Sequence, residues 1–237
     1  KYLLFLENAF PYMDNYNYHK GMKGIIQELK VLLKTKSIGT NSDRALLLDF
    51  QATLETKPEK AIKLEKDALA QIENITADNA RLVSNLHANL GGLYRMNGYP
   101  DLAREHMEKS ISLLDQFNLL HINDSIPQIA NYAMFLTEQQ EPERGISELQ
   151  KLSGIIKEYH SDDCLDYAKV QETLGTIYLM TANLPQAKTH FKRAFKIYEK
   201  IWADEPEMIE AKYQEIQELY PQIGFCIGKN LSGLLTK

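Results

Sequence analysis

The sequence repeats itself at a spacing of 42 residues, and this repeat constrains the fold more than any other feature. Two stretches, 90-LGGLYRMNGYPDLAREHMEKS-110 and 174-LGTIYLMTANLPQAKTHFKRA-194, are near-twins 84 residues apart, which is twice 42. A step of 42 places two weaker copies at residues 131–149 and 47–65. Internal repeats of this length are typical of solenoids, in which each unit packs only on its neighbours.

Proline and small residues follow the same spacing. Pro58, Pro100 and Pro142 are 42 residues apart, and Pro185 is displaced by one. Proline suits the first position of a helix, because its missing N–H would have no partner there. A small residue recurs three positions after the first three prolines and two after the fourth, and lets two helix backbones approach closely: Ala61, Ala103, Gly145 and Ala187. Each copy is therefore predicted to hold two helices, the second beginning near its proline.

Apolar residues within the copies have helical spacing. Leu86, Leu90, Leu93 and Tyr94 fall at i, i+4, i+7 and i+8, which is one helical face. The dipeptide Asn97-Gly98 ends this face, since glycine readily takes the left-handed conformation at a helix end. Strand-like alternation is almost absent. The pattern predicts an all-α fold.

The recurring residues of the fourth copy resemble the signature of the tetratricopeptide repeat. They are Leu174, Gly175, Tyr178, Ala187, Phe191 and Ala194. The 42-residue unit is similar to the longer variant found in kinesin light chains and in many bacterial multi-repeat proteins. The resemblance implies an α-solenoid, a right-handed superhelix of about six antiparallel helix pairs, and a bacterial origin.

One superhelical domain is expected over residues 1–237. Its repeats are expected at about 1–41, 42–83, 84–125, 126–167 and 168–209, with a cap at 210–237. Residues 1–13 would form the first helix, and the segment after Pro221 the last. Neighbouring units would share one continuous core, because a single helix pair cannot bury its apolar face alone.

Composition excludes several classes of function. A net charge of −5 and a pI near 5.7 argue against direct nucleic-acid binding, which needs clustered basic residues. No run of 18 apolar residues occurs, so no membrane-spanning helix is expected. The cysteines, Cys164 and Cys226, form neither a disulfide framework nor a zinc motif. We expect both to be reduced and the protein to be cytoplasmic.

No motif for catalysis, a cofactor or a metal occurs. The sequence has no glycine-rich phosphate loop, no His-Glu-x-x-His, no Cys-x-x-Cys and no Gly-x-Ser-x-Gly. His106 and His190 share one repeat position and would lie two units apart, too far to share a metal. We therefore expect a protein that is not an enzyme and binds no cofactor or metal.

The resemblance also implies a binding surface, because in tetratricopeptide solenoids the first helices line a concave groove. Mapping its inner positions gives these candidate residues: Asn85, Asn89, Arg95, Met96, Asn131, Met134, Lys169, Glu172, Thr173, Thr176 and Met180. In peptide-binding members, asparagine at the position of Asn89 and Asn131 often grips the ligand backbone, and an amide offers both a donor and an acceptor. The alternative is that these asparagines bind water or a neighbouring helix.

Other groove residues suggest the kind of ligand. Arg95 and Lys169 would select acidic groups, and three methionines would offer adaptable apolar contact: Met96, Met134 and Met180. The expected function is a non-catalytic scaffold that binds a protein or peptide. The alternative is a ligand-sensing or regulatory C-terminal domain of a larger bacterial transcription regulator or STAND-type ATPase, suggested by the absent initial methionine. A homodimer through the aromatic N-terminal end or the apolar last helix also stays open.

Overall fold

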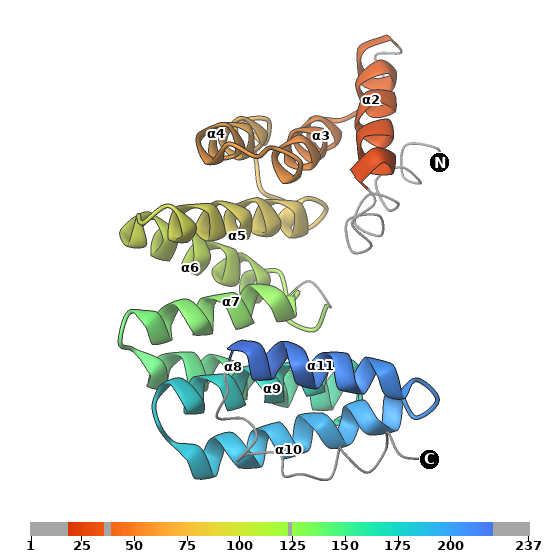
Figure 1. The fold of residues 1–237 in the computed structure, drawn as a ribbon. Coiled ribbons are helices and arrows are strands. Elements are labelled where there is room, and N and C mark those ends of the chain that lie inside the picture. Colours follow the sequence, from red (N-terminus) through yellow and green to blue (C-terminus); the bar gives the residue numbers. More distant parts are fainter. Residues whose placement is uncertain (1–18, 36–38, 123–124, 220–237) are drawn as a thin grey trace. The chain divides into compact units, whose positions relative to one another are not determined.

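The computed structural model describes residues 19–35, 39–122 and 125–219, which form helices joined by loops and contain no strand (Figure 1). The chain divides into two compact units, Lys1–Leu119 and Leu120–Lys237. The helices of unit 1 are α2 (His19–Thr35), α3 (Asn41–Thr53), α4 (Pro58–Leu69), α5 (Ala80–Met96) and α6 (Pro100–Gln116). Those of unit 2 are α7 (Ser125–Glu138), α8 (Pro142–Tyr159), α9 (Leu165–Met180), α10 (Leu184–Ile201) and α11 (Pro206–Leu219).

The helix starts confirm the prediction from proline spacing. The helices α4, α6 and α8 begin at Pro58, Pro100 and Pro142. The helix α10 begins at Leu184, so Pro185 lies in its first turn despite its displacement by one residue. Because proline fixes a helical φ angle and lacks only an N–H that has no intrahelical partner there, it marks these starts at little cost.

Consecutive helices pack in pairs. In unit 1 the pairs are α3 with α4 and α5 with α6, and in unit 2 they are α7 with α8 and α9 with α10. The next first helix packs on each pair within a unit, as α5 does on α4 and α9 on α7 and α8. The all-α fold of stacked helix pairs is therefore confirmed within each unit. The predicted terminal helices, at 1–13 and after residue 221, lie outside the described residues, and the predicted single domain, its repeat boundaries and the superhelix handedness stay predictions.

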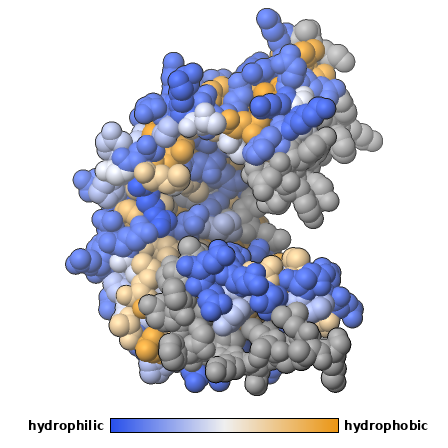
Figure 2. All heavy atoms as spheres, viewed as in Figure 1, coloured by the Kyte–Doolittle hydropathy of each residue, from blue (hydrophilic) through white to orange (hydrophobic). Residues whose placement is uncertain are grey.

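The core contains the residues that recur every 42 positions. Leu86, Leu90 and Tyr94 of α5 are buried, whereas Leu93 on the same stripe is half-buried. Hydrophilic side chains cover most of the described surface seen in Figure 2, with hydrophobic ones scattered among them. None of the described helices combines the length and the apolar character needed to cross a membrane.

In two of the helix pairs, a glycine of one helix lies close against an alanine of the other. In the α5–α6 pair, Gly91 faces Ala103, and a Cβ on Gly91 would lie 3.3 Å from the Ala103 carbonyl oxygen. In the α7–α8 pair the residues are exchanged between the helices, with Ala133 on the first and Gly145 on the second. A Cβ on Gly145 would lie 2.6 Å from the carbonyl oxygen of Ala133. This contact with the backbone at Ala133 leaves no room for a methyl group on Gly145.

Replacing Gly145 by alanine is therefore expected to destabilise the protein. The new methyl group would press on the backbone of α7, and such overpacking costs about 1–3 kcal/mol. Gly154 lies on the same helix, and a Cβ there would have nothing within 4 Å. Gly154→Ala should instead stabilise by up to about 1 kcal/mol through helix propensity. Urea denaturation of both variants tests this, and equal stabilities of the two would contradict the packing argument.

Candidate functional site

A cavity of about 230 Å³ in unit 2 is lined by residues of three first helices, α7, α9 and α11. Its lining residues are Ala130, Asn131, Met134, Glu172, Thr173, Thr176, Glu215 and Ile216. Asn131, Thr173 and Glu215 are 42 residues apart, so they hold the same position in successive copies. The repeat thus places one side-chain position of each first helix at a shared surface.

Five predicted groove residues meet at this cavity: Asn131, Met134, Glu172, Thr173 and Thr176. Glu215 and Ile216 of α11 line it too, and the prediction from sequence missed them. The repeat spacing could have identified Glu215, because this residue lies 42 positions after Thr173. Two other predicted residues of α9 do not line the cavity. Lys169 forms an ion pair with Asp166 at 3.8 Å in the first turn of α9, and Met180 is exposed at its end.

Two of the lining residues, Glu172 and Glu215, belong to a hydrogen-bonded network that extends away from this cavity. The carboxylate of Glu172 accepts a hydrogen bond from the Tyr198 hydroxyl at 2.5 Å and pairs with the Lys212 ammonium at 3.0 Å. Lys212 also contacts Glu215 at 3.1 Å. Burial acts to lower the pKa of the Lys212 amine, but the charges and hydrogen bonds of Glu172 and Glu215 together outweigh it and raise this pKa. Burial, followed by the Glu172 charge, raises the pKa of Tyr198. Glu172 therefore joins α9 to α10 and α11.

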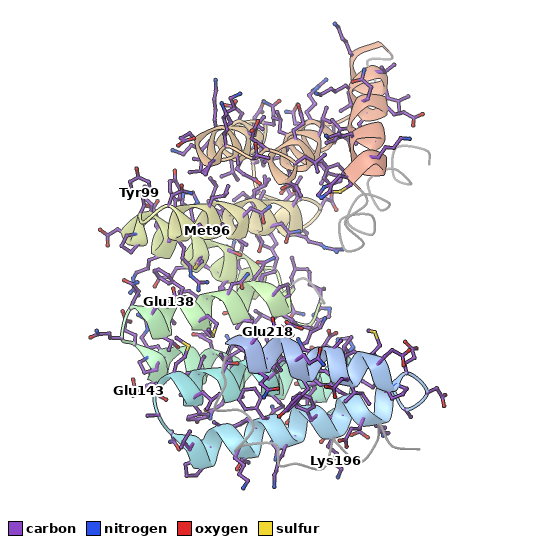
Figure 3. All side chains as sticks on the ribbon, in the orientation of Figure 1. Met96, Tyr99, Glu138, Glu143, Lys196 and Glu218 are labelled. Carbon is purple, nitrogen blue, oxygen red and sulfur yellow. The ribbon has the colours of Figure 1, made fainter. Side chains whose placement is uncertain are left out.

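The predicted residues of unit 1 lie on α5. Asn85, Arg95 and the exposed Asn89 follow its length, and Met96 is 84% exposed at its C-terminal end, near Tyr99 (Figure 3). The Asn89 amide donates to Asp49 Oδ1 of α3 at 2.8 Å and to Glu65 Oε1 of α4 at 3.3 Å. Contact with neighbouring helices, the alternative expected for this asparagine, therefore occurs. Its role toward a ligand stays a prediction.

The partners of Asn89 are two adjacent carboxyl groups. Glu65 is only 2% exposed, and its Oε2 atom has no hydrogen-bond partner among the described residues. Burial, followed by the charge and hydrogen bond of Asp49, raises the pKa of Glu65 to about 10, against a smaller opposing effect of Asn89. Glu65 therefore keeps its proton at neutral pH and shares it with Asp49.

A pair of histidines joins α5 to α6, and the prediction from sequence missed it. The Nδ1 atoms of His87 and His106 are 2.9 Å apart, so one ring donates to the other. At the equivalent positions 84 residues later, Gln171 Oε1 lies 2.9 Å from His190 Nδ1. These contacts link the two helices of a pair. In the described part of the chain, no three side chains that commonly bind metals come together.

The histidine pair makes stability depend on pH. Burial, followed by the charges of His106 and Lys109, lowers the pKa of His87 to about 4. Burial also lowers the pKa of His106. The unfolded chain therefore binds more protons than the folded one between about pH 4 and 6.5, so stability falls as pH falls through this window.

His87→Gln should remove part of this acid sensitivity, because Gln171 shows that an amide fits opposite histidine. Between pH 7 and pH 5 the variant should lose less unfolding free energy than the unchanged protein, by about 1 kcal/mol. Urea denaturation at the two pH values measures the difference. The same loss in both proteins would show that the histidine pair does not titrate on unfolding.

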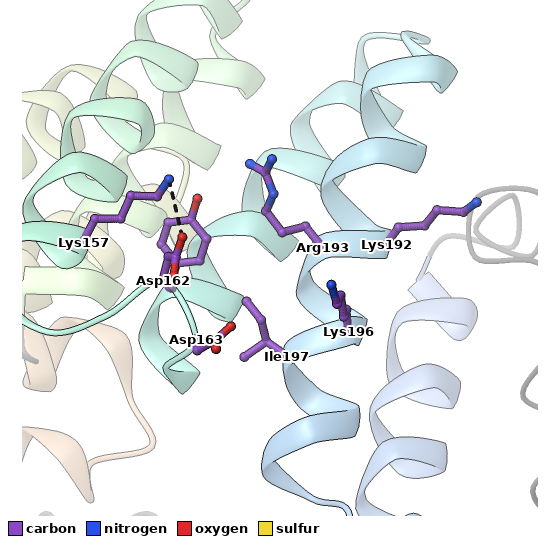
Figure 4. A pocket seen from close by; sticks show the side chains of 8 residues that line it. Lys157, Asp162, Asp163, Lys192, Arg193, Lys196 and Ile197 are labelled. Atoms are coloured by element: carbon purple, nitrogen blue, oxygen red, sulfur yellow. Dashed lines mark ion pairs between the residues drawn. The ribbon is translucent and has the colours of Figure 1, made fainter.

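A second cavity in unit 2, of about 380 Å³, lies beside the loop between α8 and α9 (Figure 4). It is lined by Lys157, Asp162, Asp163, Tyr167, Lys192, Arg193, Lys196 and Ile197. Lys157 pairs with Asp162 at 3.9 Å, and Lys200 of α10 pairs with Asp163. Lys157 also lies 5.2 Å from the centre of the Tyr167 ring. These contacts hold the loop to α8 and α10, and the aspartates offset part of the basic charge.

Comparison with known proteins agrees with this geometry. Residues 125–200 match the tetratricopeptide repeat family. No curated protein matches the chain in sequence. Among solved structures, BtubC (BKLC) from P. vanneervenii is 16% identical with a TM-score of 0.61, over 94% of this chain and 83% of that one.

Two further structures have the same kind of fold. A putative kinesin light chain from Podosopora anserina, with nearly identical TPR-like repeats, is 13% identical with a TM-score of 0.60, over 83% of this chain and 96% of that one. MamA is 16% identical with a TM-score of 0.52, over 79% of this chain and 94% of that one. At these identities the likeness concerns the fold alone. Residues 125–200 thus match the tetratricopeptide repeat family, and the fold of the chain is similar to that of TPR-like repeat structures.

Proposed function

We propose that this chain is a non-catalytic scaffold that binds a protein segment or peptide along the inner faces of its first helices. The tetratricopeptide-like fold suggests a protein-interaction scaffold in general terms. The observation that supports the finer proposal is the cavity of unit 2. There, residues spaced by 42 in the sequence, from α7, α9 and α11, surround one space of about 230 Å³.

The lining of this cavity suits an extended peptide. Asn131 is exposed, and its amide can donate to and accept from a peptide backbone. Met134 and Ile216 supply apolar surface beside it, and methionine adapts its shape to different side chains. The network of Glu172, Tyr198 and Lys212 holds α11 in place, so the cavity is formed before a ligand arrives. A preformed site loses less conformational entropy on binding.

The remaining predicted residues belong to the same proposal as flanking contacts. They are Asn85, Asn89, Arg95 and Met96 on α5, and Lys169 and Met180 on α9. The described residues give no observation that favours the alternative, a sensor domain of a larger regulator. A specific protein partner, a bacterial origin, a cytoplasmic location and a homodimer stay predictions.

Peptide selection tests the proposal. Random peptides of about 12 residues displayed on phage would be selected on the immobilised chain, and synthetic copies measured by fluorescence anisotropy. Thr176→Arg places a large side chain in the cavity and should weaken binding at least tenfold. Asn131→Ala removes the backbone contact and should weaken it about two- to twelvefold, because one net hydrogen bond contributes about 0.5–1.5 kcal/mol.

Thr189→Arg is the matched control, since Thr189 is an exposed residue of the second helix α10. This variant should bind each peptide within twofold of the unchanged chain. Thermal melting followed by circular dichroism checks that all three variants fold. Equal binding by the Thr176→Arg and Thr189→Arg variants would exclude the cavity as the site.

A further inference from the structure

We propose that the first repeat carries a subsite for a cationic side chain, an arginine or lysine of the bound segment, formed by the carboxyl groups of Asp49 and Glu65 and the amide oxygen of Asn89. The inference rests on the proposed function and adds the chemical class of ligand residue that unit 1 would select. It concerns unit 1 alone.

The repeat register shows how unusual these carboxyl groups are. Asp49 holds the position that is Gly91, Ala133 or Gly175 in later copies. Glu65 holds the position that is a large buried apolar residue in later copies: Met107, Leu149 and Phe191. Two acids thus stand where a small and a large residue are in contact in the α5–α6 and α9–α10 pairs. Packing does not require them, because burying a charged group in place of an apolar one costs free energy.

The pair can accommodate a positive charge between its two carboxyl groups. Glu65 is 2% exposed, and its Oε2 atom is buried without a hydrogen-bond partner in the described part of unit 1. Two ionised carboxylates in contact repel each other, so one of them is kept protonated. The Asn89 amide donates to both acids but carries no charge, so it does not remove this repulsion. In the absence of a ligand, the proton on one carboxyl group therefore supplies the positive charge that a bound cation would otherwise supply.

A ligand cation can take over the role of that proton. A guanidinium group has five N–H donors and matches carboxylates in geometry, and an ammonium group has three donors. When it binds, Glu65 releases its proton to solvent and both carboxylates pair with the cation. The charge of the site stays at −1, because one positive charge replaces another. Asn89 Oδ1 would accept a hydrogen bond from the same group once the amide turns.

We place the approach to the pair at Asn89 on α5, the exposed residue of the three. Asp49 is half-buried and Asn89 is exposed, and Glu65 lies behind them. Asn89 holds the same register position as Asn131 and Thr173, which line the cavity of unit 2. Lys66, the residue that follows Glu65, lies over the ring of Tyr94 with its nitrogen 5.6 Å from the ring centre.

NMR on the whole chain tests the subsite. The probes are acetyl-Gly-Arg-Gly-amide and its citrulline counterpart, which has nearly the same shape without the charge. The arginine probe should shift the side-chain amide signals of Asn89 with saturation, and the citrulline probe should bind at least tenfold more weakly. Because binding displaces a proton, the affinity for the arginine probe should rise between about pH 6 and pH 8, by up to about tenfold per pH unit.

The double variant Asp49→Asn with Glu65→Gln should abolish the response to arginine. Its matched control, Glu59→Gln with Asp67→Asn, makes the same two acid-to-amide changes at exposed positions of α4 and should leave the response unchanged. If the double variant does not fold, the comparison of arginine with citrulline on the unchanged chain still decides the question. Equal binding of the two probes, or an Asn89 response to calcium chloride but not to arginine, would overturn the subsite.

The two proposals fail in different ways. Peptides that bind at Thr176 while the arginine probe leaves Asn89 unaffected would overturn the subsite and leave the groove function standing. An arginine response at Asn89, together with selected peptides that ignore Thr176→Arg, would overturn the groove function of unit 2. In that case the first repeat would bind cations although no peptide groove exists. The premise that the subsite belongs to a peptide-binding groove would then be wrong.

Discussion

The close approach of the two helices in each pair is the contact on which the rest of each unit depends. A glycine and an alanine meet there in two of the pairs, as Gly91 with Ala103 and as Ala133 with Gly145. Their small size brings the helix backbones together, and large residues such as Phe191 then pack against the facing glycine. Because the sequence positions of the helix pairs recur every 42 residues, the first helices α7, α9 and α11 of unit 2 present equivalent side chains to one surface. The cavity of unit 2 is a consequence of this repetition.

The first repeat departs from the rule at both of its contact positions. Asp49 and Glu65 stand where other copies have small and large apolar residues, and the buried acid keeps its proton because ionisation there is unfavourable. Proteins tend to break local packing rules at sites that serve a function, and the stability lost there is recovered elsewhere. The buried contacts between α2 and α3, which include Met22, Leu29 and Phe50, stabilise the same unit. The departure from the packing pattern is thus confined to the first repeat, the pair of α3 and α4.

Much of this structure could be predicted from sequence, because the same pattern recurs in several copies and each copy supports the interpretation of the others. Proline spacing located the starts of α4, α6 and α8, and the 42-residue step brought Asn131 and Thr173 to one cavity. Contacts between different helices could not be predicted, since they depend on rotamers and on unrelated residues. The His87–His106 pair and the contacts of Asn89 with Asp49 and Glu65 are of this kind.

The central claim is that partners bind at the inner positions of the first helices. Photo-crosslinking tests it most directly, with benzoylphenylalanine placed in turn at Asn131, Thr173 and Glu215 and at the exposed second-helix positions Lys188 and Lys192. A peptide selected on the chain should crosslink from the three inner positions and not from the two outer ones. Crosslinks of equal yield from α10 would contradict the claim and place binding on the second helices.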